Sequence, residues 1–204
     1  MKTLKTAFQQ FKKTSKLTLV SGLLALAISC SPPPAPAPPC VTTGTDFQNL
    51  YANITALPGH SDVITYDSEI HSYTFELITT KTVCSIGYQS QPAIAAVPYV
   101  IEIFDNTTTT LVYSGSHVFS SAATSYVTIP SVTLNAGDSY TIRRIQTNWA
   151  PNIGNTIGRL VKKTPGSVAF PQAYGNMIIT GSKFSQNAAP QLNWAIPFID
   201  IVFQ

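Results

Sequence analysis

One short segment carries side chains whose spacing suits metal ligation. In Asp67-Ser-Glu-Ile-His71, two carboxylates and an imidazole stand at alternate positions. Alternate residues of a β-strand share a face, so Asp67, Glu69 and His71 would lie together on a strand. Such a set suits calcium or a transition ion only if further ligands, such as His60 and Asp62, join it. The alternative is an edge strand whose charges discourage pairing between sheets. We therefore predict no metal, with Asp67, Glu69 and His71 as weak candidates.

The sequence carries no recognisable catalytic apparatus. Hydrolases often place the nucleophilic serine in a Gly-x-Ser-x-Gly turn, and that motif does not occur. Ser116 and His117 are adjacent, but neighbours on a strand point to opposite faces, so hydroxyl and imidazole would not meet. Glu76 with Glu102 is a conceivable glycosidase pair, for which solvent-facing positions are the simpler explanation. We predict no catalytic residue and no cofactor; a hydrolase with an unrecognised active site is the alternative.

Aromatic and basic side chains give the remaining indication of ligand binding. Trp149 lies in a polar, turn-rich stretch where a loop is expected, so its ring would be available to a sugar. Most positive charge after residue 30 lies close by, in Arg143, Arg144, Arg159, Lys162 and Lys163. We name Trp149, Arg143 and Arg144 as candidate ligand-binding residues. The alternatives are a tryptophan that anchors its loop and a solvated basic face.

The N-terminal residues have the organisation of an export signal. Met1 to Lys16 contains five lysines and no acidic residue, and Leu17 to Ile28 is apolar or small throughout. A run of about a dozen residues is shorter than the ~20 needed to cross a bilayer. A signal peptide over residues 1–29, which is helical during export, is therefore favoured over a permanent anchor.

The end of this signal resembles the bacterial lipobox. Small residues precede a cysteine in Leu26-Ala-Ile-Ser-Cys30. The resemblance implies that a dedicated peptidase cuts before Cys30 and that this cysteine is acylated, as in palmitate-bearing lipoproteins of the envelope membrane. Bacterial sorting rules place a retention aspartate directly after the lipidated cysteine, and Ser31 stands at that position instead. The chain therefore resembles lipoproteins that are sent to the outer membrane, and the pattern does not distinguish the two faces of that membrane. Ala27 and Ser29 would also suit the ordinary signal peptidase, so plain secretion is the alternative.

A proline-rich segment follows the predicted lipid anchor. Residues 31–39 hold six prolines, and proline lacks the amide donor and fixes φ, so residues 30–39 are expected to form a stiff linker. A disordered leader is the alternative. Seven basic and nine acidic residues follow Cys30, which gives a net charge of −2 after cleavage, against +3 for the whole chain. The basic character thus belongs to the signal, and nucleic acid is excluded as a partner.

Residues 40–204 are predicted to form one all-β domain. Charged residues make up 10% of the chain, and no stretch shows a convincing helical period. Short apolar or alternating runs suit strands instead, at 73–78, 83–88, 99–104, 111–113, 126–134, 140–145, 177–180 and 196–203. Polar residues at 105–107 and 135–138 predict hairpin turns. We expect a single antiparallel β-sandwich of jelly-roll type, with a closed barrel as the alternative.

Two stretches resemble known bacterial proteins. One stretch is similar to extracellular jelly-roll domains of unknown function, in the order Cys84-Ser-Ile-Gly-Tyr88, Tyr99–Phe104, Leu111-Val-Tyr-Ser-Gly115 and the return Val132-Thr-Leu-Asn-Ala-Gly-Asp-Ser-Tyr-Thr-Ile142. The ending Ile196–Phe203 resembles the closing strand of small lipoproteins of Bacteroidetes type. Neither resemblance implies an activity.

Two of the three cysteines remain once Cys30 is assigned to the lipid. Cys40 and Cys84 form an even pair in a compartment outside the reducing cytosol, so a disulfide is predicted. Closing a loop of about 45 residues would stabilise the fold by roughly 4 kcal/mol in the chain-entropy model. Two unpaired buried thiols are the alternative.

The sequence as a whole predicts a non-enzymatic, membrane-anchored envelope lipoprotein whose β-sandwich is a binding or structural module. Its partners would be the membrane, through the lipid, and a glycan or another envelope protein. A carbohydrate-binding module of the cell surface and a hydrolase are the two alternatives.

Overall fold

The computed structural model describes residues 38–204 apart from 156 and 187–188. The predicted signal peptide, the lipidated Cys30 and the linker up to residue 37 lie outside the described residues. No helix within the described part is long and apolar enough to cross a membrane.

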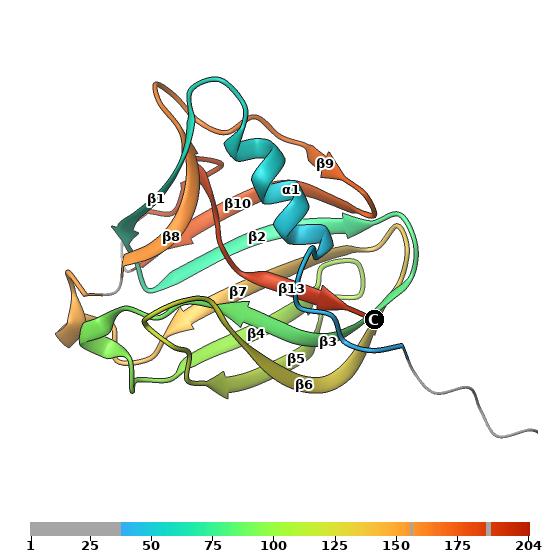
Figure 1. Ribbon diagram of the computed structural model, residues 1–204, viewed down its shortest axis with the longest axis horizontal. Helices are drawn as coiled ribbons and strands as arrows, with labels where there is room; N and C mark the ends of the chain where they lie inside the picture. The colour runs from blue at the N-terminus through green and yellow to red at the C-terminus, as the bar shows by residue number, and fades with distance from the viewer. Residues whose placement is uncertain (1–37, 156, 187–188) are drawn as a thin grey trace, which may run out of the picture. The chain divides into compact units, whose positions relative to one another are not determined.

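The described chain forms the predicted antiparallel β-sandwich, whose larger layer is a seven-stranded sheet (Figure 1). The strand order is β11-β10-β2-β7-β4-β5, and β9 pairs with β10. These strands are β2 (Ile70–Leu77), β4 (Tyr99–Asp105), β5 (Thr110–His117), β7 (Ser139–Gln146), β9 (Gln172–Tyr174), β10 (Met177–Ser185) and β11 (Gln191–Leu192).

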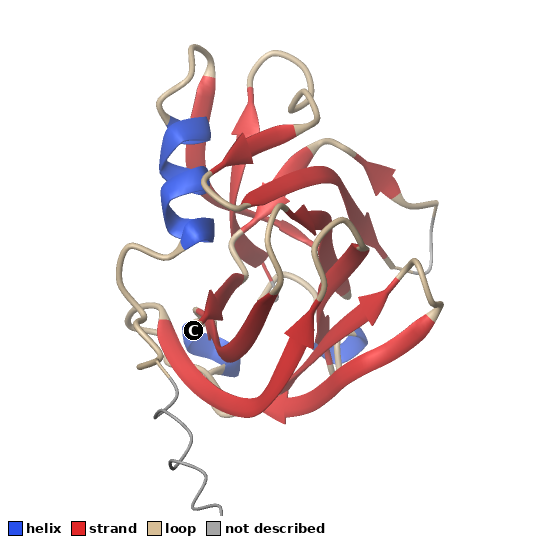
Figure 2. Cartoon of the chain, turned by 90° about the vertical axis from the view of Figure 1, so that its right-hand side faces the viewer, coloured by secondary structure: helices blue, strands red, loops and turns tan. Residues whose placement is uncertain are grey.

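Two three-stranded sheets and one helix pack against the larger sheet. One sheet has the order β13-β3-β6 and the other β1-β8-β12. Figure 2 shows the helix lying alongside the strands. The elements are α1 (Asp46–Thr55), β1 (His60–Asp67), β3 (Lys81–Tyr88), β6 (Ser125–Leu134), β8 (Ile157–Lys163), β12 (Ala195–Pro197) and β13 (Asp200–Phe203), with short 3₁₀ turns at Pro92–Ile94 and Ala150–Asn152.

The core follows the period of two that the sequence shows. On β2, Tyr73, Phe75 and Leu77 are buried, whereas Thr74 and Glu76 between them are partly exposed. These buried side chains belong to a large cluster that also takes in residues from α1 and from the facing sheets. The prediction of which face of this strand is buried is confirmed.

One helix, α1, accompanies the predicted all-β sandwich and was not expected from the sequence. Its buried residues are Phe47, Leu50, Tyr51 and Ile54, which stand at i, i+3, i+4 and i+7 and so form one apolar face. Thr45 caps the N-terminus, because its hydroxyl accepts a hydrogen bond from the backbone N–H of Gln48 at 3.0 Å. The face packs on β2, where the ring of Phe47 stacks on that of Tyr73 at 5.2 Å.

Of the two predicted hairpin turns, one closes a hairpin and the other does not. The predicted turn at 105–107 lies where β4 passes to β5 through residues 106–109, and the two strands pair as the predicted hairpin. Residues 135–138 were expected to close a second hairpin, but they carry the chain from β6 in one sheet to β7 in another. The predicted closing strand 196–203 is likewise divided: β12 ends at Pro197, which has no backbone N–H to donate, and β13 begins at Asp200 in a different sheet.

The predicted disulfide between Cys40 and Cys84 is present, with the two Cα atoms 5.9 Å apart. Cys84 lies on β3 and is buried. The bond therefore ties the first part of the described chain to the middle strand of a sheet.

Candidate functional site

The residues with metal-ligand spacing do not share a face. Asp67 ends β1 and His71 lies on β2, and Glu69 stands in the bend between the strands, so the prediction of one continuous strand is wrong. Asp67 accepts hydrogen bonds from the indole of Trp149 and from the backbone N–H of Gly154. His71 is fully buried, edge-on to Phe184. Over the described ranges, no three His, Cys, Asp or Glu side chains are grouped to hold a metal ion.

The side chain of Trp149 is held in place by a hydrogen bond from its indole nitrogen. Its Nε1 donates to Oδ1 of Asp67 at 2.9 Å, and the residue is half-buried. This contact fastens the loop after β7 to the end of β1, which is the geometry of a loop anchor.

The two predicted basic ligand residues point in opposite directions, because they are neighbours on β7. Arg143 forms an ion pair with Glu102 of β4 and is partly exposed. Arg144 is fully buried; its Nη1 donates to the backbone carbonyls of Ser68 and Glu69, both at 3.3 Å. Arg144 therefore cannot meet a ligand on a surface, and that prediction is corrected.

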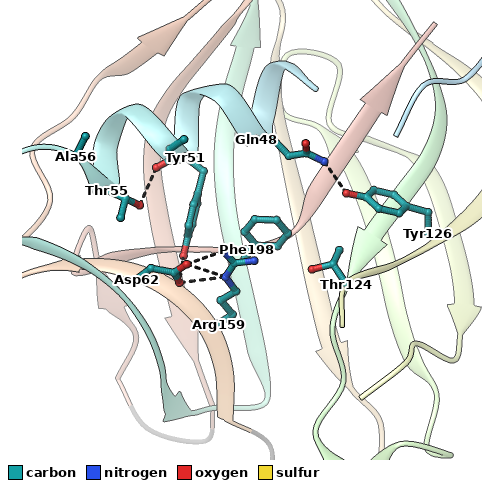
Figure 3. Close-up of a pocket in the computed structure, with 10 residues that line it drawn as sticks. Gln48, Tyr51, Thr55, Ala56, Asp62, Thr124, Tyr126, Arg159 and Phe198 are labelled. Carbon is teal, nitrogen blue, oxygen red and sulfur yellow. Dashed lines mark hydrogen bonds and ion pairs between the residues drawn. The ribbon is translucent and has the colours of Figure 1, made fainter. Parts of the chain in front are cut away.

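A different place in the fold has the form of a binding site. A hollow of about 590 Å³ opens where α1, the β1–β8 pair and β6 come together (Figure 3). Ten residues line it: Gln48, Tyr51, Ala52, Thr55, Ala56, Asp62, Thr124, Tyr126, Arg159 and Phe198. The helix supplies Gln48, Tyr51 and small side chains along one wall, and the strands supply the charged pair and the ring of Tyr126.

An ion pair forms part of the lining of this hollow. Nε and Nη2 of Arg159 donate to the carboxylate of Asp62 at 2.6–3.1 Å, and the hydroxyl of Tyr51 donates to the same carboxylate at 2.9 Å. The guanidinium also lies 4.2 Å from the ring centroid of Phe198. The side chains of Arg159 and Asp62 remain 33% and 30% exposed. The pair is thus fixed in position and still reachable from solvent.

These contacts shift two ionisation equilibria. Burial, together with the carboxylate of Asp62, raises the pKa of Tyr51 well above its ordinary value. The hydrogen bonds to Asp62 raise the pKa of Arg159. Both shifts favour the protonated forms, in which Tyr51 and Arg159 donate hydrogen bonds to Asp62.

A buried carboxylate supports the opposite wall. Asp200 has no exposed surface and accepts hydrogen bonds from Oγ1 of Thr45, Nε2 of Gln48 and the hydroxyl of Tyr126, each at 2.8 Å. Burial raises the pKa of Asp200, although its three donors act against that shift. Burial and the nearby Asp200 also raise the pKa of Tyr126. The network joins the N-terminus of α1 to β6 and β13.

The ring of Tyr126 lies across a glycine. Tyr126 on β6 pairs with Gly87 on β3, and a Cβ atom at position 87 would overlap the ring, reaching within 2.8 Å of its Cδ1 atom. The absence of a side chain at Gly87 thus lets the ring rest on the backbone of the neighbouring strand. Its hydroxyl is held by Asp200, and the residue remains partly exposed.

No family model matches the chain, and no curated protein matches it.

Little in the sequence indicated this site. Arg159 was noticed only as a member of a basic cluster, and Asp62 only as a supplementary metal ligand. Tyr126 and Gln48 carried no signal, because ordinary strand and helix residues of these types are common. The one usable clue was Gly87 within an apolar strand, since a glycine there often marks the close approach of another group.

The groups that line the hollow differ in how far they are already engaged. Asp62 is engaged by Arg159 and Tyr51, and Asp200 by three donors, so both carboxylates are committed to fixing neighbouring groups. What the hollow offers a ligand is aromatic surface, hydroxyl groups and a held guanidinium.

Proposed function

We propose that this chain is a non-enzymatic envelope lipoprotein whose β-sandwich binds a ligand in the hollow beside Arg159. Lipid on Cys30 anchors it to a membrane, and the linker over residues 30–39 carries the domain. The outer membrane is the proposed location, because Ser31 follows the cysteine. The resemblance of the last strand to small lipoproteins of Bacteroidetes type agrees with this origin.

The disulfide between Cys40 and Cys84 supports a location outside the cytosol. Structural disulfides persist in oxidising compartments and are rare where thiols are kept reduced. The export signal and the disulfide are independent features of the chain, and both favour an envelope protein.

The observation that carries the binding function is the hollow itself. Its volume of about 590 Å³ falls within the roughly 300–1,000 Å³ of small-molecule sites. Its polar side chains are already fixed by one another, so a ligand would not have to order them, and preorganisation of this kind favours binding.

Anchoring is tested by expressing the full chain in a bacterium with a lipoprotein pathway and feeding it an alkyne-tagged fatty acid. We expect label on the wild type and membrane association of the protein, both lost in Cys30→Ser. Cys40→Ser is the matched control and keeps the label. Label that persists in Cys30→Ser, or an unlabelled wild type released from the membrane, would contradict lipidation at this residue.

Binding in the hollow is tested with two helix variants. Ala52 is exposed and lines the hollow, so Ala52→Trp fills it without disturbing the core. Asn53 is the next residue of α1, is exposed and lies outside the lining set, so Asn53→Trp is the control. In a thermal-shift screen of mixed small molecules, we expect ligands that stabilise the wild type and Asn53→Trp but not Ala52→Trp. A screen without any such ligand would refute a binding role for the hollow.

A further inference from the structure

We infer that the hollow binds a neutral oligosaccharide, with one sugar ring stacked on Tyr126 and the chain passing over the Arg159–Asp62 pair. This inference rests on the proposed binding function and specifies the class of ligand.

Tyr126 has the properties of a stacking platform. One side of its ring rests on β3 at Gly87, and its hydroxyl is fixed by Asp200. The residue remains partly exposed in the lining of the hollow (Figure 3). The face of an aromatic ring carries negative charge density, which attracts the weakly positive C–H groups on the face of a sugar ring. A ring that is already immobile loses little freedom when a ligand packs on it.

Hydroxyl-binding groups surround this platform. Thr124 and Thr55 bring hydroxyl groups to the lining; the Thr55 hydroxyl donates to the backbone carbonyl of Tyr51, and its oxygen can still accept a hydrogen bond. Nη2 and Nε of Arg159 are occupied by Asp62, whereas a further guanidinium nitrogen points away from that carboxylate (Figure 3). The lining therefore holds both donors and acceptors, as a polyhydroxylated ligand requires.

The charges favour a neutral ligand. Arg159 is the one basic residue in the described lining, and Asp62 already neutralises it. The buried carboxyl group of Asp200 accepts a hydrogen bond from the hydroxyl of Tyr126. An anionic ligand would meet no unpaired cation here and would lie close to two carboxyl groups.

The site is extended beyond one sugar unit. A second hollow of about 340 Å³ shares Asp62 and Arg159 with the first and is completed by Val63, Ile64 and Gln89. The ion pair therefore lies between two adjoining depressions. A linear chain of sugars can occupy both while crossing the pair, whereas a monosaccharide would fill only part of one.

The test is calorimetric titration of the purified full chain with neutral hexasaccharides of glucose, mannose, xylose and N-acetylglucosamine. Hexagalacturonate is the charged counter-probe, and the matching disaccharides report the extent of the site. We expect at least one neutral hexasaccharide to bind, more tightly than its disaccharide. We expect binding of hexagalacturonate to be at least about tenfold weaker because of its charge.

Four variants locate the ligand. Ala52→Trp should abolish binding and Asn53→Trp should leave it unchanged. Tyr126→Ala should weaken it about two- to tenfold through loss of the ring. Since Tyr126→Ala also removes a partner of Asp200, Ala52→Trp on the exposed helix surface provides a test that does not touch that network. Trp149→Ala removes the aromatic group that the sequence favoured, and binding should be unaffected.

Different outcomes of these titrations contradict different parts of the inference. If no neutral oligosaccharide binds, yet another class of compound stabilises the protein in a manner blocked by Ala52→Trp, the sugar inference is wrong and the binding function stands. If a sugar binds and is lost in Trp149→Ala but not in Ala52→Trp, the ligand lies elsewhere. Tighter binding of hexagalacturonate would refute the argument from charge. If no compound of any class is blocked by Ala52→Trp, the inference and the proposed binding function both fail.

Discussion

Asp200→Ala is expected to destabilise the domain and loosen the wall of the hollow. The carboxylate is completely buried and accepts from Thr45, Gln48 and Tyr126. Hydrogen bonds to charged groups contribute about 1.5–3 kcal/mol each, and a buried donor left without a partner costs about 1–3 kcal/mol.

The net effect is smaller than the sum of these bonds. Gln48 and Tyr126 line the hollow, so water can replace the lost acceptor for both, whereas the hydroxyl of Thr45 is buried. Removing the carboxylate also removes the cost of burying it, which is the cause of its raised pKa. We therefore expect a loss of about 2–4 kcal/mol in the free energy of unfolding, or about 4–16 °C in Tm for a domain of this size.

The assay is urea unfolding of the wild type, Asp200→Ala, Tyr126→Phe and the double variant. Because Tyr126 and Asp200 share a hydrogen bond, the cycle should give a coupling energy of about 0.5–3 kcal/mol. The partly exposed Asp138, which accepts hydrogen bonds from Asn135 and Tyr140 outside this network, provides the comparison substitution Asp138→Ala. A loss under about 1 kcal/mol for Asp200→Ala, or additive effects within about 0.3 kcal/mol, would refute the network as a structural element.

Four further outcomes are expected. The raised pKa of Asp200 means that the folded state holds its proton at higher pH than the unfolded state, so this group's contribution to stability falls as pH rises from about 4 through the folded pKa. Unfolding of the wild type and Asp200→Asn, compared across that window, should show this fall only in the wild type. Cys84→Ser should lower the free energy of unfolding by up to about 4 kcal/mol, measured by denaturation of the variant and of the wild type with its disulfide intact. Equal stability of the two proteins would contradict a stabilising role of the disulfide. Gly87→Val should displace the Tyr126 ring and lower Tm. Gly137→Ala is the control, because an added Cβ would meet nothing within 4 Å and only the strained φ of +78° should cost about 1 kcal/mol. A loss of stability smaller at Gly87 than at Gly137 would contradict the close approach of the ring to Gly87. Asp62→Asn should free the Arg159 guanidinium and raise the affinity for hexagalacturonate, measured by calorimetry; unchanged selectivity would argue against charge neutralisation by Asp62.

Most strands could be predicted because their burial alternates within a few residues. The run from Tyr99 to Phe104 is an example: every second side chain is buried in the observed β4. The β1 strand, His60–Asp67, was missed because its exposed face carries Ile64, so polar and apolar residues do not alternate cleanly. The helix was missed because its apolar face amounts to four residues over ten positions, and Thr and Asn around it suit turns equally well.

The site could not be predicted because it is made by long-range pairing. Arg159 meets Asp62 only because β8 pairs with β1, where Ile64 is opposite Arg159. The sequence places these charges 97 residues apart and contains no signal of their register. Arg144 illustrates the converse error. Two adjacent arginines suggest a basic surface, but the alternation of side chains along β7 turns Arg144 inward. There its guanidinium donates hydrogen bonds to backbone carbonyls and lies over the rings of Tyr88 and Tyr99.

The disulfide and the glycine on which the proposed sugar platform rests lie on the same strand. Cys84 and Gly87 are three residues apart on β3, about 10 Å along an extended chain. Between them Ser85 pairs with Thr128, and Gly87 then pairs with Tyr126. Because the disulfide fixes the strand on which the ring rests, reduction should weaken sugar binding at temperatures where the domain is still folded. A titration of the reduced protein well below its Tm measures this directly, and an affinity equal to that of the oxidised protein would show that β3 holds the ring without help from the disulfide.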